Sequence, residues 1–408
     1  MSCYWAQIGT GKFDYNCGWP AASKEASRHI GPHEHDGLLV RLREASSPYG
    51  VGSLPRHRRH GRRRASPEVR LPRRLLLEAG KCKLTGRPQQ TLAAAVSRSG
   101  VGLHSGARAT ATLLPARAGE GRYFVVEGGE ELEQRVAAEV GNAEPHSQLC
   151  TTLRRGGCGG GGGPRVRTVE HLLSALEALG VDNCRVEVAG GDEVAQEWVE
   201  AIRSAGLCAA EDTRGQKLEK LAPEINEPVY LRKDECFVAA FPSSQIHITY
   251  GIDFPKVRLI VVLVNVITSN LRGIMKKYLR LGVNGFLPSW MLIYTQPRLL
   301  LQELSVYLKR VEKMRDAGLI KGGSLENALV CSMSGGWLNP PLRFEDEPCR
   351  HKVLDLIGDF SLLARNGNQG FPVAHIVAYK AGHALHTNFL RQLSGIITVD
   401  QEKLAGQC

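Results

Sequence analysis

The sequence predicts a mixed α+β protein built from two similar units. In each half of the chain, short runs with strand character precede an apolar helix, which is typical of sheets covered by helices. The segments 170–172 (EHL) and 350–352 (RHK) also echo each other, because each places a histidine at the opening of an apolar helix. We therefore expect two related α+β units that face each other.

In the first unit, we expect strands at residues 90–97, 109–114, 123–126 and 185–188, and helices at 168–179 and about 196–205. The first helix has a suitable N-cap in Thr168, a stop in Gly180 and leucines at helical spacing between them. The turn-rich stretch 99–106 connects the first two strands. The glycine tract 156–163 predicts a flexible loop.

The second unit repeats this order. Its expected strands lie near residues 236–241, 245–250, 327–331 and 374–379, and its expected helices at 302–317, 347–364 and 383–393. The charged, proline-bearing stretch 209–226 reads as a linker between the two units.

The net charge of +11 is concentrated in one short segment. Residues 54–74 contain nine arginines and one acid, so the rest of the chain carries only +3. Such a block is typical of a targeting arm, a nucleic-acid patch or a solvated tail. The segment lacks interleaved aromatic residues and any known binding module, so we expect no nucleic-acid partner.

The eleven cysteines include no Cys-x-x-Cys pair, which argues against a disulfide framework and a zinc ribbon and favours a reducing compartment. The longest apolar run, residues 259–267, is too short to cross a membrane, so no transmembrane segment is expected. No apolar core of a secretory signal peptide is visible.

Three segments carry candidate chemistry. In the helix predicted at 347–364, His351, Asp355 and Asp359 recur every four residues and share one face, where an imidazole and a carboxylate can bind zinc. Glu170 beside His171 could act as a base near a metal. His383 follows a strand and a glycine, where it could act as an acid. Each has a plainer alternative: a salt-bridge face, a charge at a helix start, and a surface histidine.

Longer stretches of the chain resemble the UDP-3-O-acyl-N-acetylglucosamine deacetylases of lipid A synthesis, especially their plant members. The resemblance runs, in the family's order, through VGLHSG (101–106), LCTTL (149–153), TVEHLLSAL (168–176), KGGSLENA (321–328), RFEDEPCRHKVLDLIGD (343–359) and AYKAGHAL (378–385). It implies two similar α/β-sandwich domains facing each other, with a zinc site between them. The domains it implies are an extension at 1–84 (disordered or targeting), domain I at 85–208, the linker at 209–226, domain II at 227–395 and a tail at 396–408.

The resemblance also implies a role for each matching residue. His171, His351 and Asp355 match zinc ligands, Glu170 the general base, His383 the general acid and Asp359 the carboxylate that orients it. Lys352 and His104 match residues that contact substrate. The implied reaction is hydrolysis of the acetamide of UDP-3-O-acyl-N-acetylglucosamine, with Zn²⁺ as cofactor. The implied location is the mitochondrion, with another organelle or the cytosol as alternatives, and the site itself would accept zinc or iron.

Two departures from the family's pattern favour an alternative, a weakened or inactive relative that still binds zinc. About half a dozen residues are missing after Val194, where the family has a longer connection. Residues 256–305 read as an atypical insert. The family has an Arg-Thr-Phe in this region, whose threonine helps hold the reacting carbonyl oxygen, and the nearest text here is Arg298-Leu299-Leu300, without a hydroxyl. Losing one such donor costs about 10²- to 10³-fold in rate.

Overall fold

The structure is a computed structural model of the whole chain. It describes residues 80–405 apart from 129–134, 146, 148, 157–162, 192–197 and most of 254–345, where it describes 261–268, 293–295, 314–316, 319–322, 330–332 and 336–339. Strands and helices occur in both halves of the described chain, which confirms the α+β class. The arginine-rich segment 54–74, the loop after Val194 and nearly all of the helix expected at 302–317 lie outside the described residues.

Two five-stranded sheets have the same topology. The first sheet has the order β3 (Val96–Val101), β4 (Arg108–Pro115), β9 (Cys184–Ala189), β5 (Arg122–Val126), β6 (Arg135–Ala137). The second has the order β12 (Val229–Lys233), β13 (Cys236–Pro242), β19 (Ala374–Tyr379), β14 (Ile246–Asp253), β15 (Val261–Thr268). In both sheets the third and fourth strands are parallel and every other pair is antiparallel.

The helices complete the repeat. In each half, four strands of the sheet are followed by a helix, the last strand and a second helix. These helices are α4 (Glu170–Leu179) and α5 (Trp198–Ala205) in the first half, and α8 (Glu347–Phe360) and α9 (His383–Ala405) in the second. Smaller elements are inserted into this plan: the hairpin β7 (Thr152–Arg154) and β8 (Arg165–Arg167), the three-stranded sheet β16 (Ile293–Thr295), β17 (Val330–Ser332) and β18 (Gly336–Asn339), and the 3-10 turns Val140–Asn142 and Ser361–Leu363.

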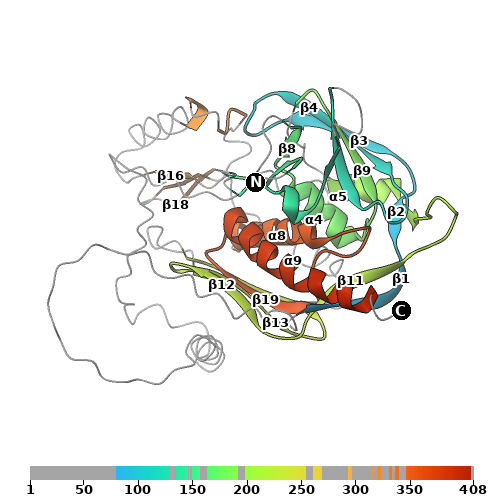
Figure 1. Cartoon of the computed structure of the whole chain (residues 1–408). Coiled ribbons are helices and arrows are strands. Elements are labelled where there is room, and N and C mark those ends of the chain that lie inside the picture. Colours follow the sequence, from blue (N-terminus) through green and yellow to red (C-terminus); the bar gives the residue numbers. More distant parts are fainter. Residues whose placement is uncertain are drawn as a thin grey trace, which may run out of the picture. The chain divides into compact units, whose positions relative to one another are not determined.

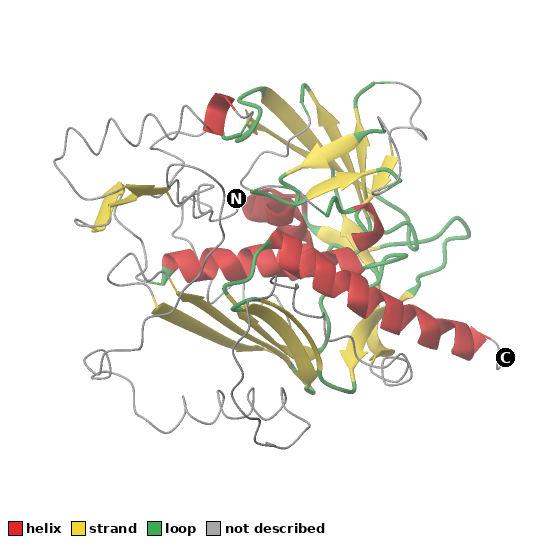
Figure 2. Ribbon diagram, turned by 60° about the vertical axis from the view of Figure 1, so that its left-hand side comes forward, coloured by secondary structure: helices red, strands yellow, loops and turns green. Residues whose placement is uncertain are grey.

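The helices lie between the two sheets. Helices α8 and α9 run along one face of the second sheet, and α4 packs directly against α8 (Figures 1 and 2). All ten residues of α4 are buried, and a single hydrophobic core joins the residues of both halves. The contact between α4 and α8 is close at Gly358, because a Cβ added there would lie 1.9 Å from the backbone oxygen of Glu170. Polar side chains on these helices are therefore held in a dry, crowded environment.

A buried carboxylate ties the two halves together on another side. Glu177 on α4 accepts a 2.5 Å hydrogen bond from the Arg122 guanidinium, and its other oxygen accepts the backbone N–H groups of Gly370 and Phe371. These two residues precede β19 of the second sheet. The carboxylate thus satisfies donors from both halves of the chain.

The structure corrects the expected start of the first helix. Thr168 was predicted as its N-cap, but the N-cap is Val169, and Thr168 has a φ of 56°. Thr168 therefore lies one residue before the N-cap, in a left-handed backbone conformation that is uncommon for a residue other than glycine. The predicted stop is confirmed, since Gly180 caps the helix with a φ of 80°.

Several expected boundaries also shift. The strand expected at 90–97 is two strands, β2 (Gln90–Leu92) and β3, separated by a bend. Part of the expected linker forms β11 (Glu219–Ile225), which pairs with β1 (Gly80–Pro88), and β2 pairs with β10 (Leu207–Ala209). The charged composition of the linker concealed this strand, although Ala222 and Ile225 on β11 are buried.

Two further segments differ from expectation. The predicted tail is helical, since α9 continues to Ala405. Residues 261–268, inside the predicted insert, form β15, which pairs antiparallel with β14 along its whole length. Their continuous apolar run is typical of a strand, and β15 completes the second sheet.

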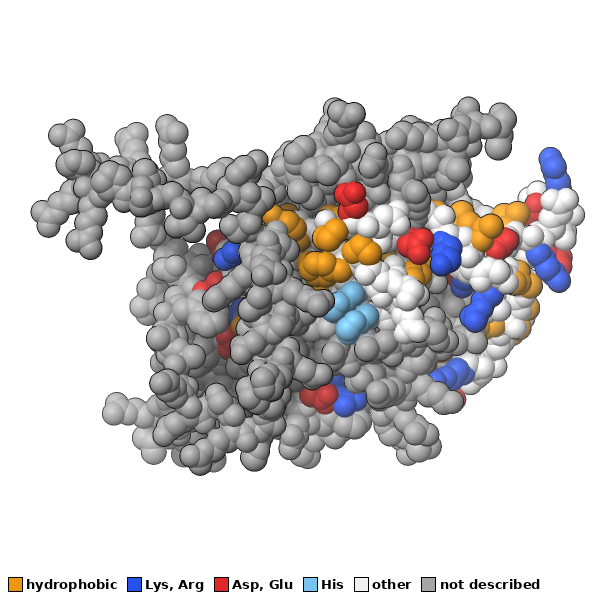
Figure 3. All heavy atoms as spheres, turned by 90° about the horizontal axis from the view of Figure 1, so that it is seen from below, with side chains coloured by type: hydrophobic (Ala, Val, Ile, Leu, Met, Phe, Trp, Pro, Cys, Tyr) orange, Lys and Arg blue, Asp and Glu red, His pale blue; other side chains and the backbone are white. Residues whose placement is uncertain are grey.

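The face of the second sheet turned away from the helices displays a histidine pair. His247 and His375 are neighbours on β14 and β19, and their rings stack with centroids 3.7 Å apart. Figure 3 shows histidine side chains beside apolar ones on this side of the molecule. Burial and the nearby His247 lower the pKa of His375 to about 4.

Candidate metal centre and catalytic cluster

The contact between α4 and α8 brings three candidate metal ligands together. His171 is the second residue of α4, while His351 and Asp355 lie one turn apart on α8. The two histidine Nε2 atoms are 3.1 Å apart, and each lies 3.4 Å from Asp355 Oδ1. The structure therefore groups the three residues predicted as ligands, all of them buried.

The spacing of these atoms fits a small metal ion. Tetrahedral zinc with bonds of about 2.0–2.1 Å separates neighbouring ligand atoms by about 3.3 Å. In the described part of the chain, Asp355 Oδ1 is fully buried yet has no hydrogen-bond partner. A buried carboxylate oxygen without a partner is costly, and a cation between the three residues would satisfy it. Two imidazoles and one carboxylate also leave a fourth position for water, as in catalytic zinc sites.

The charges at this cluster suit metal binding. Burial lowers the pKa of the His351 imidazole to about 4, so the ring is neutral near pH 7, which is the form that binds a metal. Burial alone would raise the pKa of Asp355, but Lys352 and His351 hold it well below its usual range. Lys352 Nζ donates a 3.1 Å hydrogen bond to Asp355 Oδ2. Asp355 is therefore ionised at neutral pH.

Glu170 lies beside the three candidate ligands, and its two carboxylate oxygens differ in their contacts. Its Oε2 accepts a 2.9 Å hydrogen bond from the backbone N–H of Thr151, whereas Oε1 is buried without a hydrogen-bond partner among the described residues. Burial raises the pKa of Glu170 to about 7, although the nearby His383 opposes the shift. A carboxylate with this pKa can accept a proton near neutrality.

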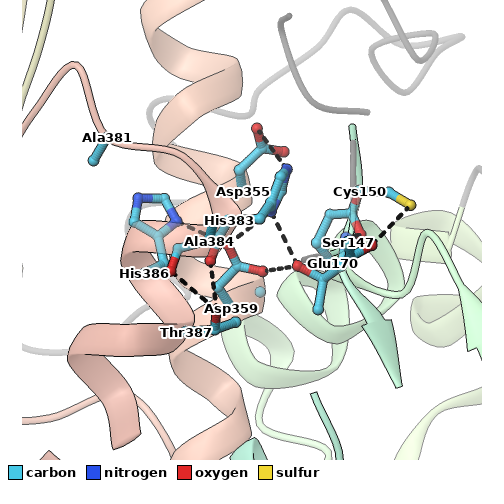
Figure 4. Close-up of polar contacts among 12 residues, drawn as sticks. Ser147, Cys150, Glu170, Asp355, Asp359, Ala381, His383, Ala384, His386 and Thr387 are labelled. Carbon is cyan, nitrogen blue, oxygen red and sulfur yellow. Dashed lines mark hydrogen bonds and ion pairs between the residues drawn. The ribbon is translucent and has the colours of Figure 1, made fainter. Parts of the chain in front are cut away.

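His383 and Asp359 form a second buried pair (Figure 4). His383 Nδ1 lies 2.8 Å from Asp359 Oδ2, and since a carboxylate only accepts hydrogen bonds, Nδ1 carries a proton. Burial disfavours the charged imidazole, but the charge and hydrogen bond of Asp359 outweigh it and raise the pKa of His383 to about 9. His383 Nε2 lies 3.8 Å from Asp355 Oδ2 and has no hydrogen-bond partner within the described ranges.

Two residues that the sequence did not single out complete this cluster. His386, one turn after His383 on α9, donates from Nδ1 to Asp359 Oδ2 at 2.7 Å. The Thr151 hydroxyl donates to Asp359 Oδ1 at 2.5 Å and lies 3.0 Å from His383 Nδ1. The spacing of His386 from His383 was a usable signal, since residues three apart share a helix face. Thr151 gave no such signal, because it approaches Asp359 from a distant part of the chain.

The two residues predicted to contact substrate lie in different surroundings. Lys352 is buried next to Asp355, as described above. His104 is buried in the turn between β3 and β4, where it accepts at Nδ1 a 3.4 Å hydrogen bond from the N–H of Ile320 and its carbonyl accepts one from Lys321. The structure thus brings Lys352 to the cluster and places His104 against residues 320–321.

No helix in the described part of the chain has the length and apolar character to span a bilayer.

Comparison with known proteins identifies the family. The family model described as UDP-3-O-acyl N-acetylglycosamine deacetylase matches residues 89–270 and 306–395. The match includes β15 and leaves residues 271–305 between its two parts. A probable mitochondrial UDP-3-O-acyl-N-acetylglucosamine deacetylase 1 of Arabidopsis thaliana is 46% identical over 76% of this chain and 89% of its own length.

Bacterial relatives carry the same family name. The UDP-3-O-acyl-N-acetylglucosamine deacetylase of a Nostoc species is 40% identical over 75% of this chain and 98% of its own length. That of Thermosynechococcus vestitus is 39% identical over 78% and 99%. The names of the plant relatives confirm the predicted mitochondrial localisation. The chain belongs to the UDP-3-O-acyl N-acetylglycosamine deacetylase family.

Proposed function

We propose that this family member hydrolyses the acetamide of UDP-3-O-acyl-N-acetylglucosamine in a zinc-dependent reaction, releasing acetate and UDP-3-O-acyl-glucosamine for lipid A synthesis. One observation carries the proposal. Three buried atoms without hydrogen-bond partners in the described chain, Glu170 Oε1, Asp355 Oδ1 and His383 Nε2, belong to one cluster on α4, α8 and α9. Each can serve a different need of amide hydrolysis: a base, a metal ligand and an acid.

In this proposal His171, His351 and Asp355 hold the metal. When bound there, zinc would supply a Lewis acid that polarises the amide carbonyl and makes water more acidic. Lys352 and His104 would contact the substrate. We also propose that the repeated topology corresponds to the two domains at 85–208 and 227–395, with the metal site between them.

Glu170 would act as the general base. Its Oε2 is fixed by the Thr151 N–H, which leaves Oε1 to accept the proton of the attacking water. A pKa of about 7 allows the carboxylate to be ionised before the step and to hold the proton after it.

His383 would act as the general acid. Its pKa of about 9 keeps the imidazole protonated at neutral pH, and Asp359 holds the ring through Nδ1. Nε2 is then the atom that donates a proton to the departing amine nitrogen. The nitrogen must be protonated because a free amide anion is a very poor leaving group.

The decisive variant is Glu170→Gln, measured for metal content and for acetate release on the full chain. The amide side chain cannot take up a proton, so turnover should fall by roughly 10²- to 10⁴-fold while the metal stays bound. The matched control is Glu187→Gln, on the solvent side of β9 with its side chain 44% exposed, which should leave turnover unchanged. Turnover of Glu170→Gln near that of the unmodified chain would refute the assignment.

A second candidate is a relative that binds zinc but hydrolyses weakly or not at all. It is favoured by the connection missing after Val194 and by Arg298-Leu299-Leu300, the nearest text to the family's Arg-Thr-Phe, which has no hydroxyl. Stoichiometric metal without acetate release from the unmodified chain would support this second candidate and reject the first.

A further inference from the structure

The proposed mechanism gives no role to the hydroxyl of Thr151. This residue is 2% exposed and lies between Leu149, whose φ is 71°, and the start of β7. A leucine rarely adopts a positive φ, so the chain makes an unfavourable turn to enter this segment. Such strain persists only where surrounding contacts enforce it, and those of Thr151 lead to the catalytic cluster.

Thr151 contacts groups from three helices at once. Its backbone N–H donates to Glu170 Oε2 on α4 at 2.9 Å. Its hydroxyl donates to Asp359 Oδ1 on α8 and lies 3.0 Å from His383 Nδ1 on α9. Within the described residues it is therefore in direct contact with both the proposed base and the proposed acid.

We propose that Thr151 is a positioning residue that sets the proposed base and acid relative to each other, its N–H fixing Glu170 and its hydroxyl fixing Asp359 and, through Asp359, His383. This inference rests on the proposed function for the roles of Glu170 and His383. The contacts themselves do not depend on those roles.

The hydroxyl acts on the orientation of a carboxylate. Asp359 Oδ2 accepts hydrogen bonds from His383 and His386, both carried by α9. In the described chain the donor to Oδ1 is Thr151 alone, and it comes from the first half. Removing it leaves a buried, charged oxygen without a donor, so the carboxylate can rotate to find another. The His383 ring would turn with it, and Nε2 would leave its place near the reacting amide.

The test compares Thr151→Val, which has the same shape without the hydroxyl, with Thr151→Ser, which keeps it. For Thr151→Val we expect kcat to fall roughly 10- to 100-fold with KM within about twofold, because the hydroxyl acts on the chemical step and not on substrate binding. Thr151→Ser should restore kcat to within about threefold. The matched control is Thr112→Val on the first sheet, where the hydroxyl pairs with the exposed Ser97.

A double-variant cycle separates positioning from general damage to the fold. If the hydroxyl acts through Asp359, Thr151→Val should lose its effect on kcat in an Asp359→Asn background. An equal fold-loss in both backgrounds would overturn the proposal.

A proton NMR measurement tests the positioning without relying on turnover. The Nδ1 protons of His383 and His386, bound to a buried carboxylate, should resonate far downfield and are assigned by His383→Gln and His386→Gln. Thr151→Val should shift the His383 resonance, whereas Thr151→Ser and Thr112→Val should not. A shift in a chain that releases no acetate would support the positioning and reject the proposed function. No shift and no change in kcat in Thr151→Val would overturn the positioning and leave the proposed function standing.

Discussion

Helices α4 and α8 hold the same place in two sheets of equal topology, yet they carry different groups. Helix α4 brings Glu170 and His171 to the cluster, whereas α8 brings two predicted ligands and Asp359. The second helix of each half differs even more. Helix α9 begins with His383, while α5 begins with Trp198, and all buried residues of α5 are apolar.

The two halves therefore share a scaffold but not a site. A single cluster occupies the contact between α4 and α8, and each half supplies groups that the other lacks. A helix pair whose residues are almost all buried gives such groups a dry environment in which their charges interact strongly.

The largest expected effect on metal binding and activity comes from removing the proposed metal ligands, of which α4 carries one and α8 carries two. His171→Ala removes the one proposed ligand on α4, whose residues are all described, and His351→Ala removes one of the two proposed on α8; either loss should abolish stoichiometric metal and lower acetate release by roughly 10³-fold or more. Metal analysis and an acetate assay check this. His375→Ala, a histidine far from the cluster on the outer sheet face, is the control and should retain both. Full metal in either ligand variant would break the assignment of ligands to both helices.

The contact between the halves can be disturbed at Gly358. An alanine there would place a methyl group against the backbone of Glu170, which cannot move without shifting α4. We expect Gly358→Ala to lower the free energy of unfolding by about 1–3 kcal/mol and to reduce activity. Gly395→Ala on α9, where nothing lies within 4 Å of the added carbon, is the matched control. Equal thermal midpoints for the two variants would show that the contact tolerates a side chain.

The proposed pairing of a base on α4 with an acid on α9 predicts a bell-shaped pH profile. Glu170 must be ionised, so kcat/KM should rise about tenfold per unit below a pKa of about 7. His383 must be protonated, so kcat/KM should fall above a pKa of about 9. His383→Gln should lose the fall at high pH. A profile that is flat between pH 5 and 10 would contradict both roles.

The smallest effect concerns the histidine pair of the second sheet, which has no counterpart in the first. The pKa of His375 is lowered from 6.5 to about 4, so the folded protein binds fewer protons than the unfolded chain between these values. The unfolding free energy should therefore decline as pH falls from about 6.5 to 4, and not change on this account above 6.5. His375→Gln should flatten this slope in urea titrations, and an unchanged slope would contradict the lowered pKa.

Helical spacing alone predicted which groups share a face of one helix, whereas the grouping of His171 with residues of α8 was implied only by the family resemblance. His351, Asp355 and Asp359 share a face because helical spacing alone puts them there. The role of Thr168 was misjudged because its backbone conformation depends on the turn that enters α4. The contacts of Thr151 bridge 208 and 232 residues of sequence, a separation that no local pattern can express.

Strand prediction likewise succeeded where a local pattern was present and failed where only pairing between distant segments defines the strand. Those with a buried face, such as β4 and β19, were predicted within a residue or two of their ends. The pairing of β1 with β11 was not, because both strands carry charged residues and neither shows an alternating apolar pattern.

The Glu177 carboxylate has a consequence for how this protein unfolds. It needs Arg122 from the first half and the N–H groups of Gly370 and Phe371 from the second, so separating the halves would strip donors from a buried charge while exposing their shared core. We therefore expect neither half to be stable alone and denaturation to be a single cooperative transition. For the same reason, a gene cut between residues 209 and 219 should yield fragments that fold only in each other's presence.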